Sequence, residues 1–403
     1  MGLGFVATGV LIRELGAASY GTWAALTSLL AWIQLSDFGV GYALKNRIAS
    51  ASKPQEMLRL VSGVFQFYAL IAIFFVILFL LFGDLLAIVK DYRPESLLLY
   101  IGTIIFFPLT IGAAVLQGMR KNSLSSLISF LQSIFWVISI LLLAWTRTSL
   151  LLLSLLNISL VLLMGIGQCA LSARVLVGSV RKAFIELFNF SNLRLALPLW
   201  SVGIRFILLQ LSSVILFSLG TYLTYSNLSS VEAAKYDILF KLFQVPLTFF
   251  NVVISVYWVE ITKAIAINDR QALQKRFVQL QLIALCVGLI MLLFSLFIAS
   301  PLINVYSGGE INTSVSDALA FWVLIMIQSF AYSGAVFLNA AEKLHGQIIF
   351  AVVAAALLIP TVLLFYAYGM GVSAVPLATA ALIMPSLFYC NFSAYRHVIK
   401  KAG

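Results

Sequence analysis

The fold is decided by the stretch Ala233-Ala-Lys-Tyr-Asp-Ile-Leu-Phe-Lys-Leu-Phe-Gln-Val-Pro-Leu-Thr-Phe-Phe-Asn-Val-Val-Ile-Ser-Val-Tyr-Trp258. It is long and apolar enough to cross a membrane as one helix, which takes about 20 residues. Its polar residues recur every three or four positions, so an α-helix gathers them on one face. This polar stripe consists of Asp237, Lys241, Gln244, Thr248, Asn251 and Ser255. Because lipid cannot solvate such a face, we expect the stripe to meet water or a partner helix and to mark a transport pathway.

The rest of the chain shares this composition. Of its 403 residues, 62% are hydrophobic and only 10% are charged, whereas a soluble domain carries about 25% charged residues. The sequence therefore predicts an all-α polytopic membrane protein. Its three cysteines are isolated and its two histidines lie in or beside short basic stretches, so we expect neither a metal site nor a cofactor.

Apolar segments of spanning length recur along the whole chain. About twelve are predicted, in two six-helix lobes around a central cavity: up to 12, 20–44, 60–82, 96–117, 123–145, 149–171, 195–219, 233–258, 277–300, 317–340, 347–369 and 371–392. The first of them is short, about half a span, and no cleavage site follows it, so it is not interpreted as a signal peptide. The longest inner loop separates the first six segments from the last six. This loop sets the predicted domains: a lobe at 1–178, a linker at 179–194 and a lobe at 195–403.

The basic residues indicate the orientation of these segments. Eighteen of the 25 Lys and Arg residues fall in loops on one side, four fall on the other side, and three lie inside predicted spans. Because basic loops stay in the cytoplasm, both termini are predicted to be cytoplasmic. The net charge of +11 then reflects topology and contact with anionic membrane lipids, and nucleic-acid binding is not expected. Within the linker, 184–190 is predicted to be an amphipathic segment on the membrane surface.

Arg205 is the single residue that points most clearly to a function, because it lies about ten residues into the segment 195–219. At that position the side chain lies about 15 Å into the membrane. The free energy of inserting an arginine there is unfavourable by at least ~2.5–3.5 kcal/mol. One interpretation is that Arg205 binds an anionic group of a substrate, since its planar fork suits phosphate. The other is a structural ion pair with Asp237 or a bond to helix carbonyls.

The stripe itself allows two readings. Asp237 and Lys241 are spaced for an ion pair on one helix, and Gln244, Thr248 and Asn251 have the chemistry to bond a neighbouring helix. Alternatively, the pair lines a water-filled path that takes up cations or protons and the remaining residues continue that path. Pro246 removes a backbone bond in this stretch and permits a kink.

Other candidates are weaker. Asp37 lies near the inner end of the second segment and is predicted either to act as a cap or loop anchor or to be a cytoplasmic gate residue. Lys235 is expected near the outer boundary with its ammonium reaching for water.

No nucleophile motif, P-loop or paired catalytic carboxylates occur, so no catalytic residue and no enzyme activity are predicted. At an offset of 217, Tyr20 aligns with Asp237, which suggests a duplicated six-helix unit.

Two motifs resemble a known family. The run Leu11-Ile-Arg-Glu-Leu-Gly-Ala-Ala-Ser-Tyr-Gly21 and the later run Leu35-Ser-Asp-Phe-Gly-Val-Gly-Tyr-Ala-Leu44 look like the turns that begin and end helix 2 of polysaccharide flippases. These are the O-antigen transporters of the multidrug/oligosaccharidyl-lipid/polysaccharide exporter superfamily. The turn Gln117-Gly118 and the start of the eighth segment at Tyr236 extend the resemblance. At the N-terminus the chain departs from it, because family members carry more residues before the first turn.

The resemblance implies a bacterial inner-membrane protein of lipopolysaccharide biosynthesis. It would move an undecaprenyl-pyrophosphate-linked oligosaccharide to the outer leaflet by alternating access, with a glycan polymerase and chain-length proteins as partners. The candidate residues fit this role, because sugar hydroxyls need polar partners in hydrocarbon and pyrophosphate needs cations. We expect Arg205, Lys241, Gln244, Asn251, Gln210 and Thr248 to bind the substrate, and Asp237 and Asp37 to couple transport to a proton or sodium gradient or to gate it.

Two rival functions are weighed. A multidrug exporter of the same superfamily would favour buried acids that attract cationic drugs, whereas the deep charges here are mostly basic. A membrane glycan polymerase or ligase would need a large outer loop, and the outer loops of this chain are short.

Overall fold

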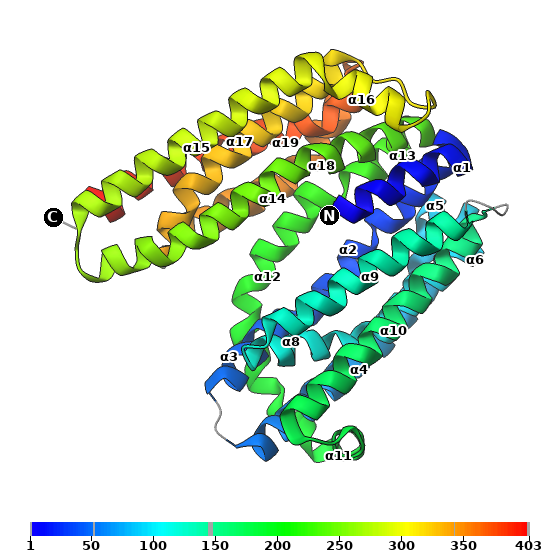
Figure 1. Cartoon of the computed structure of the whole chain (residues 1–403), viewed down its shortest axis with the longest axis vertical. Coiled ribbons are helices and arrows are strands. Elements are labelled where there is room, and N and C mark those ends of the chain that lie inside the picture. Colours follow the sequence, from blue (N-terminus) through cyan, green and yellow to red (C-terminus); the bar gives the residue numbers. More distant parts are fainter. Residues whose placement is uncertain (1, 51–52, 144–147, 342, 401–403) are drawn as a thin grey trace. The chain divides into compact units, whose positions relative to one another are not determined.

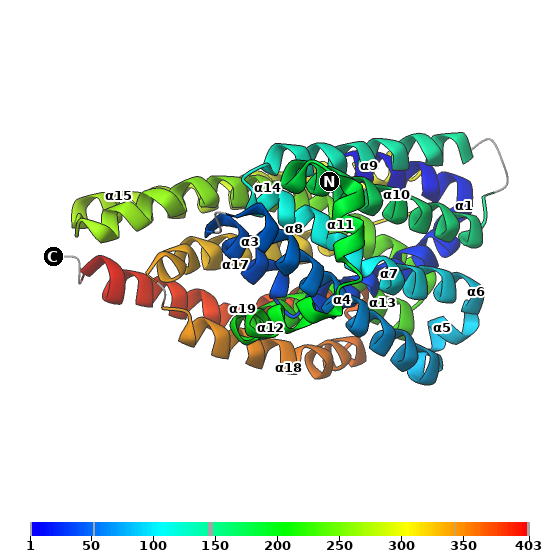
Figure 2. The ribbon, with the colours of Figure 1, turned by 90° about the horizontal axis from the view of Figure 1, so that it is seen from below.

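The computed structural model describes residues 2–50, 53–143, 148–341 and 343–400. In that part of the chain all regular elements are helices, as the sequence predicts (Figures 1 and 2). Their contacts divide the chain into two compact units, which we describe separately. Unit 1 comprises Met1–Ala25 and Ser212–Gly403, and unit 2 comprises Leu26–Leu211. This division falls inside two helices, and the predicted domains 1–178, 179–194 and 195–403 stay a prediction.

Unit 1 holds the segment with the polar stripe. Its helices are the first part of α1 (Gly2–Ser28), the last part of α12 (Leu197–Ser218), α13 (Gly220–Asn227), α14 (Ser230–Ala266), α15 (Arg270–Phe297), α16 (Ala299–Tyr306), α17 (Val315–Ala340), α18 (His345–Ala367) and α19 (Ala374–Ser393). At the centre of this unit lies α17, which packs against α14, α15 and α19. Small residues such as Gly334 permit this close packing, since a Cβ there would lie 2.7 Å from the backbone nitrogen of Asn391.

Unit 2 is built around α4 and α10. Its longer helices are α3 (Val40–Ser50), α4 (Pro54–Phe82), α8 (Ile111–Gly118), α9 (Asn122–Leu143), α10 (Leu150–Val177) and the first part of α12. Short helices complete it: α2 (Leu30–Gln34), α5 (Ala87–Asp91), α6 (Arg93–Ser96), α7 (Gly102–Phe106) and α11 (Val180–Glu186), with one-turn segments between them. The segment 96–117, predicted as one span, lies within residues 93–118, which run as several helical pieces in succession.

Nine helices of the described residues are long and apolar enough to cross a membrane. They match nine of the twelve predicted segments, and α12 corresponds to a tenth, 195–219. The two remaining segments, up to 12 and 20–44, differ from the prediction. The first merges into α1, which bends at Gly16 with a φ of 76°, and the second breaks near Phe38 and Gly39, both at positive φ. These backbone conformations favour glycine and end a regular helix.

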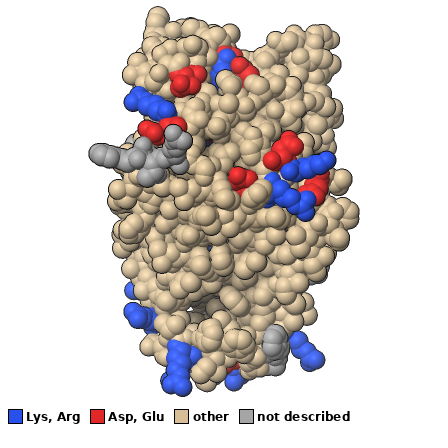
Figure 3. Space-filling view, turned by 90° about the vertical axis from the view of Figure 1, so that its right-hand side faces the viewer, with Lys and Arg blue, Asp and Glu red and all other residues tan. Residues whose placement is uncertain are grey.

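The surface agrees with a membrane environment. Large apolar side chains are exposed along the spanning helices, among them Leu81, Leu142, Phe249 and Phe297. On the face drawn in Figure 3 most atoms belong to uncharged residues, and Lys and Arg gather at its lower end. This pattern, together with the apolar helices, confirms a multi-pass membrane protein of the all-α class.

The linker is fixed to unit 2 by buried polar contacts. The amide of Gln66 on α4 donates to the carbonyls of Leu187 and Asn189, and the hydroxyl of Ser62 donates to that of Glu186. Phe184 and Phe188, by contrast, are exposed beside basic residues. The segment is thus amphipathic, with its backbone docked on the protein and its aromatic side chains free to enter a membrane surface.

Candidate functional site

The candidate site lies on α14, the longest helix of unit 1. Its first turn is capped by Ser229, whose hydroxyl accepts from the backbone N–H of Glu232 at 3.1 Å. One face of α14 is buried by large apolar side chains such as Phe243, Leu247 and Phe250, which pack on the neighbouring helices. The adjacent face carries the polar stripe, which meets α1 at Asp237 and becomes more exposed toward Ser255.

A compact polar cluster forms where the stripe meets α1. We call Thr8, Tyr20, Asp237 and Lys241 the Lys241 cluster. The ammonium of Lys241 lies 2.7 Å from Asp237 Oδ2 and donates to the Tyr20 hydroxyl at 2.9 Å. Tyr20 in turn donates a short hydrogen bond to the same Asp237 oxygen. Thr8 Oγ1 lies 3.5 Å from both Lys241 Nζ and the Tyr20 hydroxyl.

The members of the cluster differ in exposure. The Asp237 side chain is only 10% exposed and Tyr20 is buried, whereas the Lys241 side chain is 42% exposed. The carboxylate is therefore held in place by two donors, and the ammonium keeps an open side. The predicted ion pair is present, and its basic half remains accessible to an anion that approaches from the open side.

Contacts between α1 and the C-terminal end of α16 hold the α1 part of the cluster. The backbone N–H of Gly9 donates to the Tyr306 hydroxyl at 2.7 Å, and the guanidinium of Arg13 donates to the carbonyls of Val305 and Tyr306 at 2.6 and 3.1 Å. Burial raises the pKa of Tyr306 to about 12, so its phenol stays protonated at neutral pH. Gly21 allows α1 to lie against α14, because a Cβ there would stand 1.6 Å from the carbonyl oxygen of Ser230.

The rest of the stripe becomes more exposed along α14. Gln244 and Thr248 are half-buried, while Asn251 and Ser255 are exposed. The hydroxyl of Thr248 donates to the Gln244 carbonyl at 2.9 Å, and that of Ser255 donates to the Val252 carbonyl. Among the described residues, the stripe is therefore covered at Asp237 and uncovered at Asn251 and Ser255.

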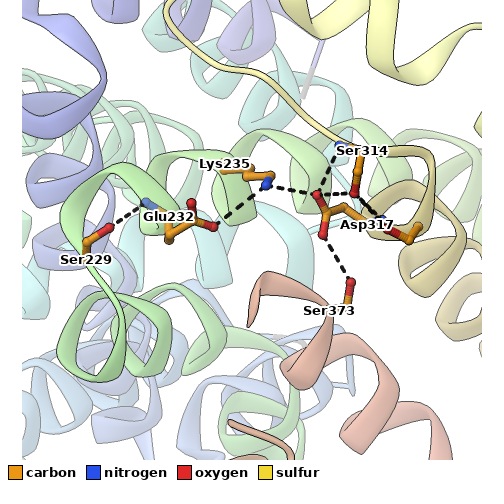
Figure 4. A network of polar contacts seen from close by, with 7 residues as sticks. Ser229, Glu232, Lys235, Ser314, Asp317 and Ser373 are labelled. Atoms are coloured by element: carbon orange, nitrogen blue, oxygen red, sulfur yellow. Dashed lines mark hydrogen bonds and ion pairs between the residues drawn. The ribbon is translucent and has the colours of Figure 1, made fainter. Parts of the chain in front are cut away.

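A second polar network closes the start of α14 (Figure 4). Lys235 Nζ lies 2.9 Å from Asp317 Oδ2 and 3.8 Å from Glu232. Asp317 also accepts from the backbone and hydroxyl of Ser314, which form a capping box for α17, and from the hydroxyl of Ser373. The Lys235 side chain is only 17% exposed, so the expectation that its ammonium reaches for water was wrong. This network joins α14 to α17 and has a structural role.

Removing one end of this network is expected to destabilise unit 1 unequally. Asp317→Ala removes the ion pair and the carboxylate's half of the capping box together and should lower the free energy of unfolding by about 3–5 kcal/mol. Lys235→Met leaves Asp317 bonded to the two serines, so the expected loss is only about 1–3 kcal/mol. Thermal melting of the purified variants in detergent measures both. Equal losses would show that the cap contributes nothing.

The other candidate residues lie in unit 2. Arg205 belongs to α12, but its side chain is outside the described residues, as is that of Trp200. Gln210 is half-buried on the same helix, and its Oε1 is buried with no hydrogen-bond partner among the described residues. Asp37 accepts from the backbone N–H of Gly39 at 2.9 Å, which is the capping role that the sequence offered as one alternative. Its role as a gate stays a prediction.

The sequence analysis missed three residues that the structure brings to these networks: Thr8, Tyr20 and Asp317. Tyr20 carried a signal, since the proposed repeat pairs it with Asp237, and the two side chains are in fact in contact. Thr8 and Asp317 carried none, because a threonine or an aspartate near a helix end is ordinary. Among the residues that the structure describes, no group of three His, Cys, Asp or Glu side chains could hold a metal.

Comparisons with known proteins identify the family and the fold of the chain. The family model described as "Polysaccharide biosynthesis protein" matches residues 1–259. No curated protein matches the chain. A solved inward-facing multidrug resistance MATE family transporter of the MOP superfamily is similar, with a TM-score of 0.75 and 12% identity over 99% of this chain and 95% of that one. The lipid II flippase MurJ in an inward closed conformation is also similar, with a TM-score of 0.70 and 16% identity over 99% of this chain and 88% of that one. At these identities the likeness shows the fold alone.

Proposed function

The chain belongs to the family of polysaccharide biosynthesis proteins, and we propose that it is a flippase for undecaprenyl-pyrophosphate-linked oligosaccharides such as O-antigen units. The family match and the transporter fold support a flippase or exporter. The finer assignment is carried by one observation: α14 presents an open ammonium, Lys241, at the end of a track of amides and hydroxyls that passes from half-buried to exposed. This arrangement matches an anionic, hydroxyl-rich headgroup.

The chemistry of the headgroup explains why a protein is required. Each sugar hydroxyl costs several kcal/mol in hydrocarbon without a partner, so unaided crossing is negligible. Gln244, Thr248 and Asn251 supply partners along α14, and Trp258 offers an aromatic face. Lys241 and Arg205 are proposed to bind the pyrophosphate, since charge-assisted bonds to phosphate are the strong ones. The lipid tail can stay in the bilayer throughout.

Asp237 gives the site a way to release its ligand. In the structure its carboxylate forms an ion pair with the Lys241 ammonium, so an arriving pyrophosphate competes with Asp237 for that ammonium. We propose that this competition keeps binding reversible and that protons or cations compete for Asp237 in turn. The membrane potential offers about 2.3 kcal/mol per charge per 100 mV for such coupling. Both termini are proposed to be cytoplasmic and the protein to reside in the bacterial inner membrane.

Reconstitution tests the proposal directly. The purified chain in liposomes should move a radiolabelled polyprenyl-pyrophosphate oligosaccharide between leaflets, and excess inorganic pyrophosphate should inhibit this movement. A lipid-linked oligosaccharide with a neutral linker of the same length is the matched control and should move much more slowly. Equal rates for the two lipids, or movement of a cationic dye in their place, would point to an exporter of another substrate class.

A further inference from the structure

The exposed face of α14 is divided along its length. The stripe residues Gln244, Thr248 and Asn251 occupy one half, and Val245, Phe249 and Val252 occupy the other. Successive residues on an α-helix are separated by about 100° and 1.5 Å. Each polar side chain of the stripe therefore has an apolar neighbour at the same depth on the same helix.

The apolar half of this face borders a groove between α14 and α15. The groove has a volume of about 360 Å³, lies wholly within unit 1 and is open at Phe249, which is 70% exposed. Its walls are purely apolar and are formed by residues such as Val245, Pro246 and Val253 on α14 and Ile283, Val287 and Met291 on α15. Pro246 lacks a backbone N–H and lies at the start of the groove.

We propose that this groove binds the first isoprene units of the polyprenyl tail of the transported lipid. The inference rests on the proposed function and extends it to a second subsite. The groove begins at Val245, four residues from Lys241, which is about 6 Å along the helix. A pyrophosphate at Lys241 therefore has its attached tail at the mouth of the groove. From there the groove continues along α14 and α15 away from Lys241, so a tail bound in it would run along the two helices.

The physical role of the groove is positioning. A tail gains no hydrophobic free energy by leaving lipid for an apolar wall, so association must come from packing. Branched isoprene units are suited to an irregular groove of Val, Ile and Phe side chains. Once the headgroup is bound, the tail is held nearby at high effective concentration, and even weak packing then orders it. The groove thereby orients the headgroup along the stripe.

A groove-filling variant tests this inference in the reconstituted full chain. Val287→Trp places an indole in the groove, and Leu289→Trp, at a 52% exposed position on the same helix outside it, is the matched control. Two substrates with one headgroup are compared, one with a full-length polyprenyl tail and one with a straight saturated tail of the same number of carbons. We expect Val287→Trp to slow the full-length polyprenyl lipid about tenfold, as overpacking would, and to leave the straight-tailed lipid and the control variant unchanged.

The outcomes separate the two proposals. If Val287→Trp and Leu289→Trp move the full-length lipid equally well, the tail site is wrong while the flippase function stands. If the wild-type chain moves neither lipid, the proposed function fails, and photolabelling decides the groove independently. A polyprenyl pyrophosphate with a photoreactive tail should label Val253 or Met291 in the wild-type chain. Unlabelled polyprenyl pyrophosphate should suppress this labelling and phosphatidylglycerol should not. Equal suppression by both lipids would identify the occupant as ordinary bilayer lipid and overturn the inference.

Discussion

Replacing Lys241 with Gln is expected to lower export of the lipid-linked glycan about tenfold to a hundredfold, because it removes a charge-assisted hydrogen bond to pyrophosphate that is worth about 1.5–3 kcal/mol. Gln keeps most of the length of the side chain and a donor. It removes the charge, which is the property that the proposed function requires. The measurement is the display of surface glycan in cells that depend on this chain, normalised to the amount of protein in the membrane.

The ion pair in the structure complicates this experiment. Lys241→Gln leaves the buried carboxylate of Asp237 with Tyr20 as its remaining partner, and an unpaired buried charge is itself destabilising. A double-mutant cycle separates the two effects. Asp237→Asn combined with Lys241→Gln restores a neutral, hydrogen-bonding pair and should restore protein levels. Transport should remain low in the double variant, because the cation is still absent.

Asp237→Asn alone completes the cycle. It frees Lys241 from its competitor, so binding of pyrophosphate should tighten and release should slow. If the double variant instead transports as well as the wild-type chain, the pair is only structural. That result would move the pyrophosphate site away from α14.

Periodicity and composition were sufficient to predict most of the fold. A helix of about 20 apolar residues leaves a strong signal, and nine predicted segments coincide with apolar helices of spanning length. The failures lie where the backbone departs from a helix. Gly16 bends α1 without ending it, and Phe38 and Gly39 break the second segment at positive φ. A hydropathy pattern contains no information about such dihedral angles, although the glycines marked the positions.

The candidate site was predictable in part, for a related reason. The spacing of Asp237 and Lys241 on one helix predicts their ion pair, since local geometry fixes it. The contact of Tyr20 with both residues joins positions more than 200 residues apart, and spacing along the chain cannot predict such tertiary contacts. The same reason explains the wrong prediction for Lys235. Its ammonium was expected to reach water, but it pairs with Asp317, which lies at the start of a different helix.

Arg205→Ala is expected to reduce glycan export by more than about a hundredfold, because a bidentate guanidinium contributes two charge-assisted bonds of about 1.5–3 kcal/mol each to a phosphate group. Arg205→Lys keeps the charge and loses the planar fork, so an intermediate rate is expected. Leu208→Ala, at an exposed position on the same helix, is the control for damage to α12 and should export normally. The readout is again surface glycan at matched protein levels.

The two basic residues should also depend on each other. If Arg205 and Lys241 bind one pyrophosphate, their losses are not additive, since removing either cation already misplaces the ligand for the other. The variant Arg205→Ala/Lys241→Gln should then export little less than either single variant. Fully additive losses would mean that the two residues act on separate steps. Normal export by Arg205→Ala at normal protein levels would show that Arg205 does not bind the substrate. Its position in the membrane would then be explained by a structural partner.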